Sequence, residues 1–173
     1  MRYLPFLLTL ALAPGCQDPT HDNAVDALGG EAPGIPKGPL HRAGQPCLTC
    51  HGGEGPANTE FSVAGTVYLL SYQDTVAPGT TVLVEDSTGV AGNVVTNAAG
   101  SFFINGNDWH PVFPLQVTLT YGNITKQMPV QIGRAGSCAD CHLAGSRGGP
   151  NTPGRIWIAL NQSKLAQATQ PAQ

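Results

Sequence analysis

Phe61-Ser-Val-Ala-Gly-Thr-Val-Tyr-Leu-Leu70 is the stretch that decides the fold class. Apolar and β-branched residues alternate along it with small or polar ones, which is the period of a half-buried β-strand. Similar stretches follow at residues 80–85, 90–96, 101–104, 115–121 and 124–132, separated by turn signals such as Pro78-Gly79. We therefore predict a mainly β protein whose centre, residues 61–132, is a small β-sandwich of Greek-key type.

The composition also favours short strands joined by many turns. The chain has 173 residues, enough for one domain with tails, and contains 22 glycines and 15 prolines. No helical period of useful length is present. Charged residues make up only 11%, the formal net charge is −3, and there is no run of lysine or arginine. We therefore expect no binding to nucleic acid.

Two pentapeptides of the form Cys-x-x-Cys-His flank the predicted sandwich. They are Cys47-Leu-Thr-Cys50-His51 and Cys138-Ala-Asp-Cys141-His142. Two thiols at this spacing can each form a thioether with a vinyl group of one porphyrin, and the imidazole that follows can ligate the iron. We predict two covalently attached haem c groups, in loop-rich segments at residues 41–60 and 133–160, with the histidine of each motif as an iron ligand.

The sequence around the two motifs is repeated. Arg42-Ala-Gly precedes the first motif and Arg134-Ala-Gly precedes the second, and a Gly-Pro-(Ala)-Asn-Thr stretch follows each of them. This repetition predicts two equivalent haem pockets. Because Arg42 and Arg134 occupy equal places in the repeat, we predict that their guanidinium groups pair with haem propionates.

Three other uses of the paired cysteines compete with haem attachment. Four thiolates could hold a zinc ion, and each pair could form a disulfide in an oxidising compartment. Neither use needs a histidine directly after each pair. A thioredoxin-like redox pair needs a βαβ context, which this sequence lacks.

Each haem iron also needs a sixth ligand or keeps an open position. Three further histidines exist, namely His21, His41 and His110. His21 falls in a predicted linker and Met128 in a predicted strand, where a core position is expected. His41 directly precedes the repeated Arg-Ala-Gly, and His110 lies on a predicted sandwich loop. We predict His41 and His110 as the distal ligands of two bis-histidine haems, without assigning either to one haem.

The N-terminal residues are typical of an export signal. Arg2 precedes an apolar core at residues 4–13, which is too short to span a bilayer. The segment 12–16, Leu-Ala-Pro-Gly-Cys, resembles a bacterial lipobox, so we predict a signal peptide at residues 1–15 and a lipidated Cys16. Lipid on Cys16 and haem on the other four cysteines account for all five. Residues 16–40 are expected to be a flexible tether and residues 161–173 a disordered tail.

Two resemblances to known families emerge from these residues. Val-Ala-Gly-Thr-Val-Tyr (63–68), Ala-Pro-Gly-Thr-Thr-Val-Leu-Val-Glu-Asp (77–86) and Val-Thr-Asn-Ala-Ala-Gly-Ser-Phe-Phe-Ile (95–104) resemble a carboxypeptidase-regulatory-like, transthyretin-type domain. That resemblance covers residues 61–132 and implies a sandwich fold without implying any chemistry. The two pentapeptides are similar to those of multihaem c-type cytochromes, which implies electron carriage through the haems.

The expected function is electron transfer by a dihaem c-type lipoprotein that is not an enzyme. We expect it to be exported and lipid-anchored in the bacterial cell envelope, at the periplasmic face or the outer membrane, with other cytochromes as redox partners. One alternative is a non-redox surface binding module with disulfide-bonded cysteine pairs. Another is a dihaem peroxidase-like enzyme, which would need an iron with an open position. Oligomerisation is left open.

Overall fold

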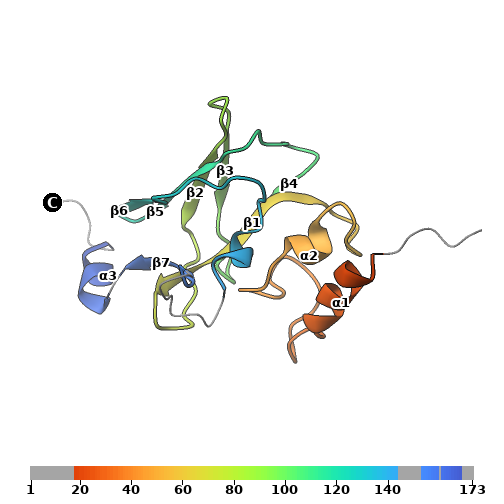
Figure 1. Cartoon of the computed structure of the whole chain (residues 1–173). Helices are drawn as coiled ribbons and strands as arrows, with labels where there is room; N and C mark the ends of the chain where they lie inside the picture. Colours follow the sequence, from red (N-terminus) through yellow and green to blue (C-terminus); the bar gives the residue numbers. More distant parts are fainter. Residues whose placement is uncertain (1–17, 144–152, 160, 169–173) are drawn as a thin grey trace, which may run out of the picture.

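The computed structural model describes residues 18–143, 153–159 and 161–168. In these ranges the strands form a three-stranded sheet, in the order β4-β1-β7, and a four-stranded sheet, in the order β3-β2-β5-β6 (Figure 1). The strands are β1 (Phe61–Leu70), β2 (Thr81–Glu85), β3 (Ala91–Val95), β4 (Ser101–Asn105), β5 (Gln116–Tyr121), β6 (Ile124–Gln127) and β7 (Ile156–Ala159). The predicted mainly β fold, a small sandwich, is confirmed.

The hydrophobic core is built from the alternating apolar residues of both sheets. Val82 and Val84 of β2 are fully buried, while the alternate residues Thr81, Leu83 and Glu85 are only partly buried, as a strand with one core-facing side requires. Val63 and Val67 of β1 and Phe102 of β4 join the same cluster from the other sheet. The period-two pattern that predicted the fold is therefore the pattern that fills its core.

The central strand β1 offers two places where other parts of the chain can dock. It pairs with β4 in antiparallel fashion and with β7 in parallel fashion, but β7 begins only at the level of Val67. Nearer the start of β1, the edge on the β7 side is taken by the segment that leads into the second motif. There the Ala64 N–H donates to the Gly136 carbonyl at 3.0 Å, and Ser137 forms a parallel bridge with Ala64. The second motif is thus attached directly to the sheet.

Two strands differ from the sequence-based expectation. Strand β6 ends at Gln127 rather than at residue 132. After it, the Met128 N–H donates to the Val117 carbonyl at 2.9 Å, and Ile132 forms an isolated bridge with Leu115. The sequence does not predict strand β7, since residues 133–160 are expected to form a loop-rich haem segment. Strand β7 has only four residues, which is too short for a recognisable strand pattern in the sequence, and it forms by pairing with β1.

Short helices lie in two segments for which no ordered element was predicted. Helix α1 (Pro19–Ala27) falls within the expected tether and α3 (Gln162–Ala168) within the expected tail. Asp18 caps α1 by accepting from the Thr20 N–H at 2.9 Å. At the end of α3, the side-chain and backbone N–H groups of Asn123 donate to the last two carbonyls of the helix, at 2.9 and 3.1 Å. A local side chain thus satisfies the start of α1 and a distant residue satisfies the end of α3, two short helices that are weak in isolation.

None of the helices in the described ranges combines the length and the apolar run needed to cross a membrane. The predicted signal peptide and the lipidation site Cys16 lie outside the described residues.

The Asp86 carboxylate joins the β2–β3 turn to a second loop. It accepts from the Thr88 hydroxyl at 2.6 Å, from the N–H groups of Thr88 and Val90, and from the Val112 N–H at 3.2 Å. The hydrogen bond from Thr88, with those from the backbone, lowers the pKa of Asp86 below its usual value. Since these bonds favour the ionised carboxylate, its contribution to stability is present above the unfolded pKa of about 4.

We therefore expect the wild-type chain to lose stability as the pH falls below about 4, through the folded pKa of Asp86. Asp86→Asn should show a smaller change between pH 7 and pH 3, because its side chain does not titrate. Urea midpoints at both pH values test this, with Glu54→Gln, which alters an exposed carboxylate, as the control. An acid loss that is equal in Asp86→Asn and wild type would contradict the assignment.

Candidate functional site

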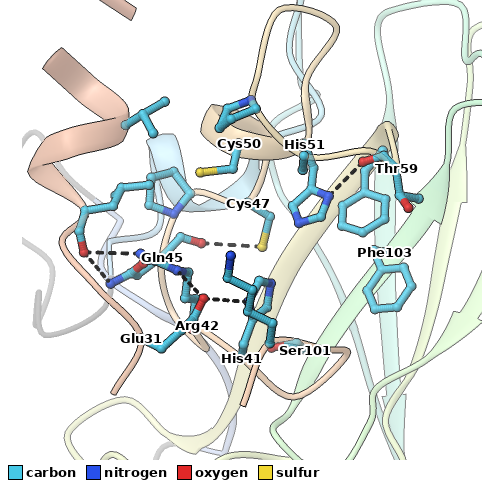
Figure 2. Close-up of a pocket in the computed structure, with 18 of the residues that line it drawn as sticks. Glu31, His41, Arg42, Gln45, Cys47, Cys50, His51, Thr59, Ser101 and Phe103 are labelled. Atoms are coloured by element: carbon cyan, nitrogen blue, oxygen red, sulfur yellow. Dashed lines mark hydrogen bonds and ion pairs between the residues drawn. The ribbon is translucent and has the colours of Figure 1, made fainter. Parts of the chain in front are cut away.

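The first Cys-x-x-Cys-His motif forms one helical turn. Helix α2 (Leu48–His51) follows Cys47, whose carbonyl accepts from the N–H groups of His51 at 2.8 Å and Cys50 at 3.2 Å. The Cys47 thiol also lies 3.6 Å from the Gln45 carbonyl. This turn gathers both thiols and the imidazole on one side of the cavity drawn in Figure 2.

The second motif has the same backbone geometry. The Cys138 carbonyl accepts from the N–H groups of His142 at 2.8 Å and Cys141 at 3.3 Å, around the 3-10 turn η1 (Cys138–Asp140). Its thiol lies 3.8 Å from the Gly136 carbonyl, again two residues earlier. The repetition seen in the sequence therefore extends to the hydrogen bonds of the motifs.

Both motif histidines are oriented in the same way by a backbone carbonyl. His51 Nδ1 lies 2.7 Å from the Thr59 carbonyl, and His142 Nδ1 lies 2.8 Å from the Gly154 carbonyl. A carbonyl only accepts, so Nδ1 carries the hydrogen in each ring, and in the neutral ring Nε2 keeps its lone pair. In each case the carbonyl stands two residues before a strand, β1 or β7. An Nδ1 hydrogen bond of this kind is the usual support of an imidazole that ligates a metal through Nε2.

The first motif borders a cavity of about 750 Å³, a volume typical of cofactor sites. Cys47, Cys50 and His51 line it together with residues of the N-terminal segment, β1 and β4. The ring of Phe61 is stacked on His51, with 4.2 Å between ring centres, and Phe103 is stacked on Phe61 at 4.6 Å. These aromatic rings give the cavity an apolar wall. Two thiols, an imidazole with a free Nε2 and apolar walls together fit a covalently bound haem.

His41 lies on the same cavity, close to His51. The two ring centres are 5.9 Å apart and the rings are nearly perpendicular, at 79°. His41 Nδ1 donates to the Glu31 carboxylate at 3.2 Å. Although burial raises it, the pKa of Glu31 is lowered overall by the hydrogen bonds from Arg42 and His41. An anionic Glu31 therefore fixes the His41 ring from behind.

Arg42 holds the N-terminal segment against the cavity. Its guanidinium donates to the carbonyls of Leu28 and Gly29, at 3.3 and 2.6 Å, to the Gln45 side chain at 3.1 Å, and to Glu31 at 3.2 Å. These donors meet protein acceptors, and the pairing of Arg42 with a haem propionate stays a prediction. Arg134 is exposed and lies outside the residues that line the cavity.

The two motifs dock close together on β1. The Gly44 N–H donates to the Thr66 hydroxyl at 2.8 Å, and the Gly136 carbonyl accepts from Ala64, two residues earlier on the same strand. Gly44 and Gly136 are equivalent positions of the repeated Arg-Ala-Gly. Their anchoring points are therefore roughly 7 Å apart along the strand.

The four motif thiols have different surroundings. Cys138 belongs to the hydrophobic core, and burial raises the pKa of its thiol to about 12, with the nearby Cys47 thiol adding to the effect. Burial also raises the pKa of Cys47. Cys50 is half-buried and Cys141 is exposed. In the second motif, His142 and the exposed Cys141 are accessible to a haem, whereas Cys138 is packed tightly in the core. Residues 144–152, which come next, lie outside the described ranges.

All four motif cysteines are free thiols, and the described ranges hold no group of three or more histidine, cysteine, aspartate or glutamate side chains arranged for a metal ion.

The remaining predicted ligand, His110, is not brought to the second motif. It is exposed and lies beside Gly106, which is level with Glu60 at the start of β1. The His142 side chain is instead held near the start of β7, on the other side of β1 and at the level of Val67. From strand rise and spacing, the end of β4 and the start of β7 are roughly 20 Å apart.

Two further candidates also lie away from the second motif. His21 is on α1 and lines a small hollow together with Glu54 and Pro56 of the loop after the first motif. Met128 packs against the sandwich core, as the sequence predicts.

No protein-family model matches the chain, and no curated protein or solved structure shows significant similarity to it.

Sequence reasoning missed two parts of the site. Glu31 lies in a polar, glycine- and proline-rich segment that carries no motif, so nothing local marked it. The sequence predicts Phe61 and Phe103 only as strand residues, and the fold shows that their rings stack across β1 and β4 and that both line the cavity.

Proposed function

We propose that this chain is a dihaem c-type electron carrier, exported and lipid-anchored through Cys16 in the bacterial cell envelope, with other cytochromes as its redox partners. The observation that carries the proposal is the shared geometry of the two motifs. In each, one helical turn carries the two cysteines, of which Cys138 is buried, and a backbone carbonyl holds the histidine Nδ1 so that Nε2 is free. Disulfide-bonded pairs in a non-redox binding module would leave both of these histidine arrangements unexplained.

The chain's own groups supply attachment and ligation. Each motif thiol would add across one vinyl C=C bond of haem, forming a C–S bond while its proton goes to the neighbouring vinyl carbon, so that no electrons are gained or lost. His51 and His142 offer Nε2, and the Thr59 and Gly154 carbonyls keep each ring in the required tautomer. When bound, haem supplies a one-electron iron couple.

The protein also provides the environment that sets a redox potential. Phe61 and Phe103 give the first site an apolar wall, which limits the access of water. Docking of both motifs on β1, at Thr66 and Ala64, keeps the two sites next to each other. Electron exchange is favoured between adjacent sites. This supports a role as an electron relay rather than as a protein with two isolated redox centres.

A redox titration followed by visible absorption tests this function. The protein should be produced in a host that attaches c-type haem. We expect a reversible change between oxidised and reduced spectra, described by two one-electron steps. A spectrum that does not respond to potential would contradict the proposal.

A further inference from the structure

We propose that the cavity beside the first motif contains a carboxylate-binding subsite at the start of β4. There the Ser101 hydroxyl donates to one propionate of the haem, and the Lys37 ammonium compensates its negative charge. This inference rests on the proposed function. It adds two residues to Arg42, the propionate partner that the sequence predicts at this site.

One face of strand β4 lines the cavity. Its alternate residues Ser101, Phe103 and Asn105 all border the space, as the period of a strand requires. The strand therefore offers a hydroxyl at its start, an aromatic ring in the middle and an amide at its end. Ser101 and Asn105 are roughly 13 Å apart along the strand, so they mark two separate polar ends of one apolar wall.

The Ser101 end carries a hydroxyl hydrogen without an acceptor. Ser101 and Thr66 are both 6% exposed, their hydroxyl oxygens are 3.1 Å apart, and Thr66 Oγ1 also accepts from the Gly44 N–H at 2.8 Å. Two hydroxyl hydrogens share one hydroxyl–hydroxyl bond, so one of them has no acceptor within the described residues. If Thr66 donates to Ser101, no hydrogen stays unpaired inside the protein, and the hydrogen of Ser101, which lines the cavity, points into it.

A cation lies at the same end of the cavity. The Asn97 side chain donates to the Pro39 carbonyl at 2.6 Å, which holds the segment after Lys37 against the turn that precedes β4. Lys37 lines the cavity, and its ammonium forms no ion pair within the described ranges. Arg42, the other lysine or arginine on the cavity, is already paired with Glu31 at 3.2 Å. Lys37 is therefore the cation that is available to an added carboxylate.

The opposite end of the β4 face is unsuitable for a second anion. The Asn105 amide donates to the Asp108 carboxylate at 3.1 Å, and Glu60 directly precedes Phe61, the register partner of Asn105. Two carboxylates near this end would repel a propionate. Asp26, an acidic residue that also lines the cavity, belongs to α1 and not to β4. The charges thus favour the Ser101 end.

The shape of haem favours the same end. The two propionates of haem lie on the edge opposite its two vinyl groups, and the thiols of Cys47 and Cys50 would fix the vinyl edge. Figure 2 shows Cys50 and Ser101 on opposite sides of the cavity. A haem attached through the first motif would therefore direct its carboxylate edge toward Ser101. A hydrogen bond from a hydroxyl to an ionised carboxylate is short and strong.

Resonance Raman spectra of the holoprotein test the inference. Haem staining of a denaturing gel first establishes that both haems are attached, and absence of stain would refute the proposed function itself. The propionate bending band shifts when the carboxylate loses a hydrogen bond, so we expect Ser101→Ala to shift this band for one haem of the two. Ser62→Ala, the matched control, removes a β1 hydroxyl that bonds the Ile104 carbonyl and should shift neither band. Unshifted bands in Ser101→Ala would overturn the inference.

Lys37→Gln gives a second reading if Ser101→Ala folds poorly, because Lys37 is exposed. Without the ammonium, the negative charge of the propionate is uncompensated and favours the ferric form. We therefore expect one of the two midpoint potentials to fall in Lys37→Gln and to stay near the wild-type value in Lys37→Arg. Lys164→Gln removes the same charge from the exposed Lys164 on α3 and should move neither potential. Equal potentials in Lys37→Gln and Lys164→Gln would overturn the inference.

Discussion

Gly136→Ala is expected to lower the free energy of unfolding by roughly 3 kcal/mol, at the upper end of the cost of overpacking. A Cβ at this position would overlap the Ser62 carbonyl oxygen and lie 2.9 Å from the Val63 Cα. Both are backbone atoms of the central strand β1, which cannot move without disturbing the two strands beside it. The substitution should also weaken the bond between the Gly136 carbonyl and the Ala64 N–H, which attaches the second motif to the sheet.

Gly133→Ala is the matched control, three residues earlier in the same segment. A Cβ there meets nothing within 4 Å, and its backbone is outside the left-handed region. Its effect should stay within about 0.5 kcal/mol, as for most surface substitutions. Urea unfolding of both variants provides the comparison. Equal stability of Gly136→Ala and Gly133→Ala would show that the docking of Gly136 on β1 is described incorrectly.

Replacing Cys47 and Cys50 together by alanine is expected to halve the covalently bound haem, from two groups per chain to one. The thioether bonds of the first site cannot form without these thiols, whereas the second site has its own pair. The double variant Cys138→Ala/Cys141→Ala should also retain one group, and a variant lacking all four thiols should retain none. The haem absorbance of the denatured protein, divided by the protein concentration, measures the haem content per chain.

The second pair carries an additional structural cost. Cys138 is part of the sandwich core, so Cys138→Ala should also reduce stability, while removal of the half-buried Cys50 should have little effect of that kind. Haem content and urea midpoints therefore separate the two roles. If either pair could be removed without any loss of haem, the assignment of one haem to each motif would be contradicted.

The sandwich could be predicted because its signals are local. The alternation in residues 61–70 and the turn residues between the later strands are properties of neighbouring residues, and they gave the strands that form the core. Strand β7 could not be found in this way. Its four residues become a strand only because β1 offers a free edge beyond Val67, and that edge is a property of the assembled sheet.

The motif residues could be predicted for the same reason, since a Cys-x-x-Cys-His turn is contained in five consecutive residues. The surroundings could not. Arg42 donates to the carbonyls that follow α1, and this holds Glu31 close to His41. These contacts join residues that are ten or more positions apart in the sequence. His110 is predicted as a haem ligand only from the number of available histidines. Its position in the fold depends instead on which end of β4 it follows.

The central claim is that this chain carries two covalently attached haems, and the mass of the intact chain tests it most directly. The protein is produced with a haem-attachment system, purified and denatured, and its mass is compared with that of the variant lacking all four motif thiols. We predict that the wild-type mass exceeds the sequence mass by two haem groups and that the variant has the sequence mass alone. A wild-type chain whose mass matches its bare sequence, with no haem added, would contradict the account.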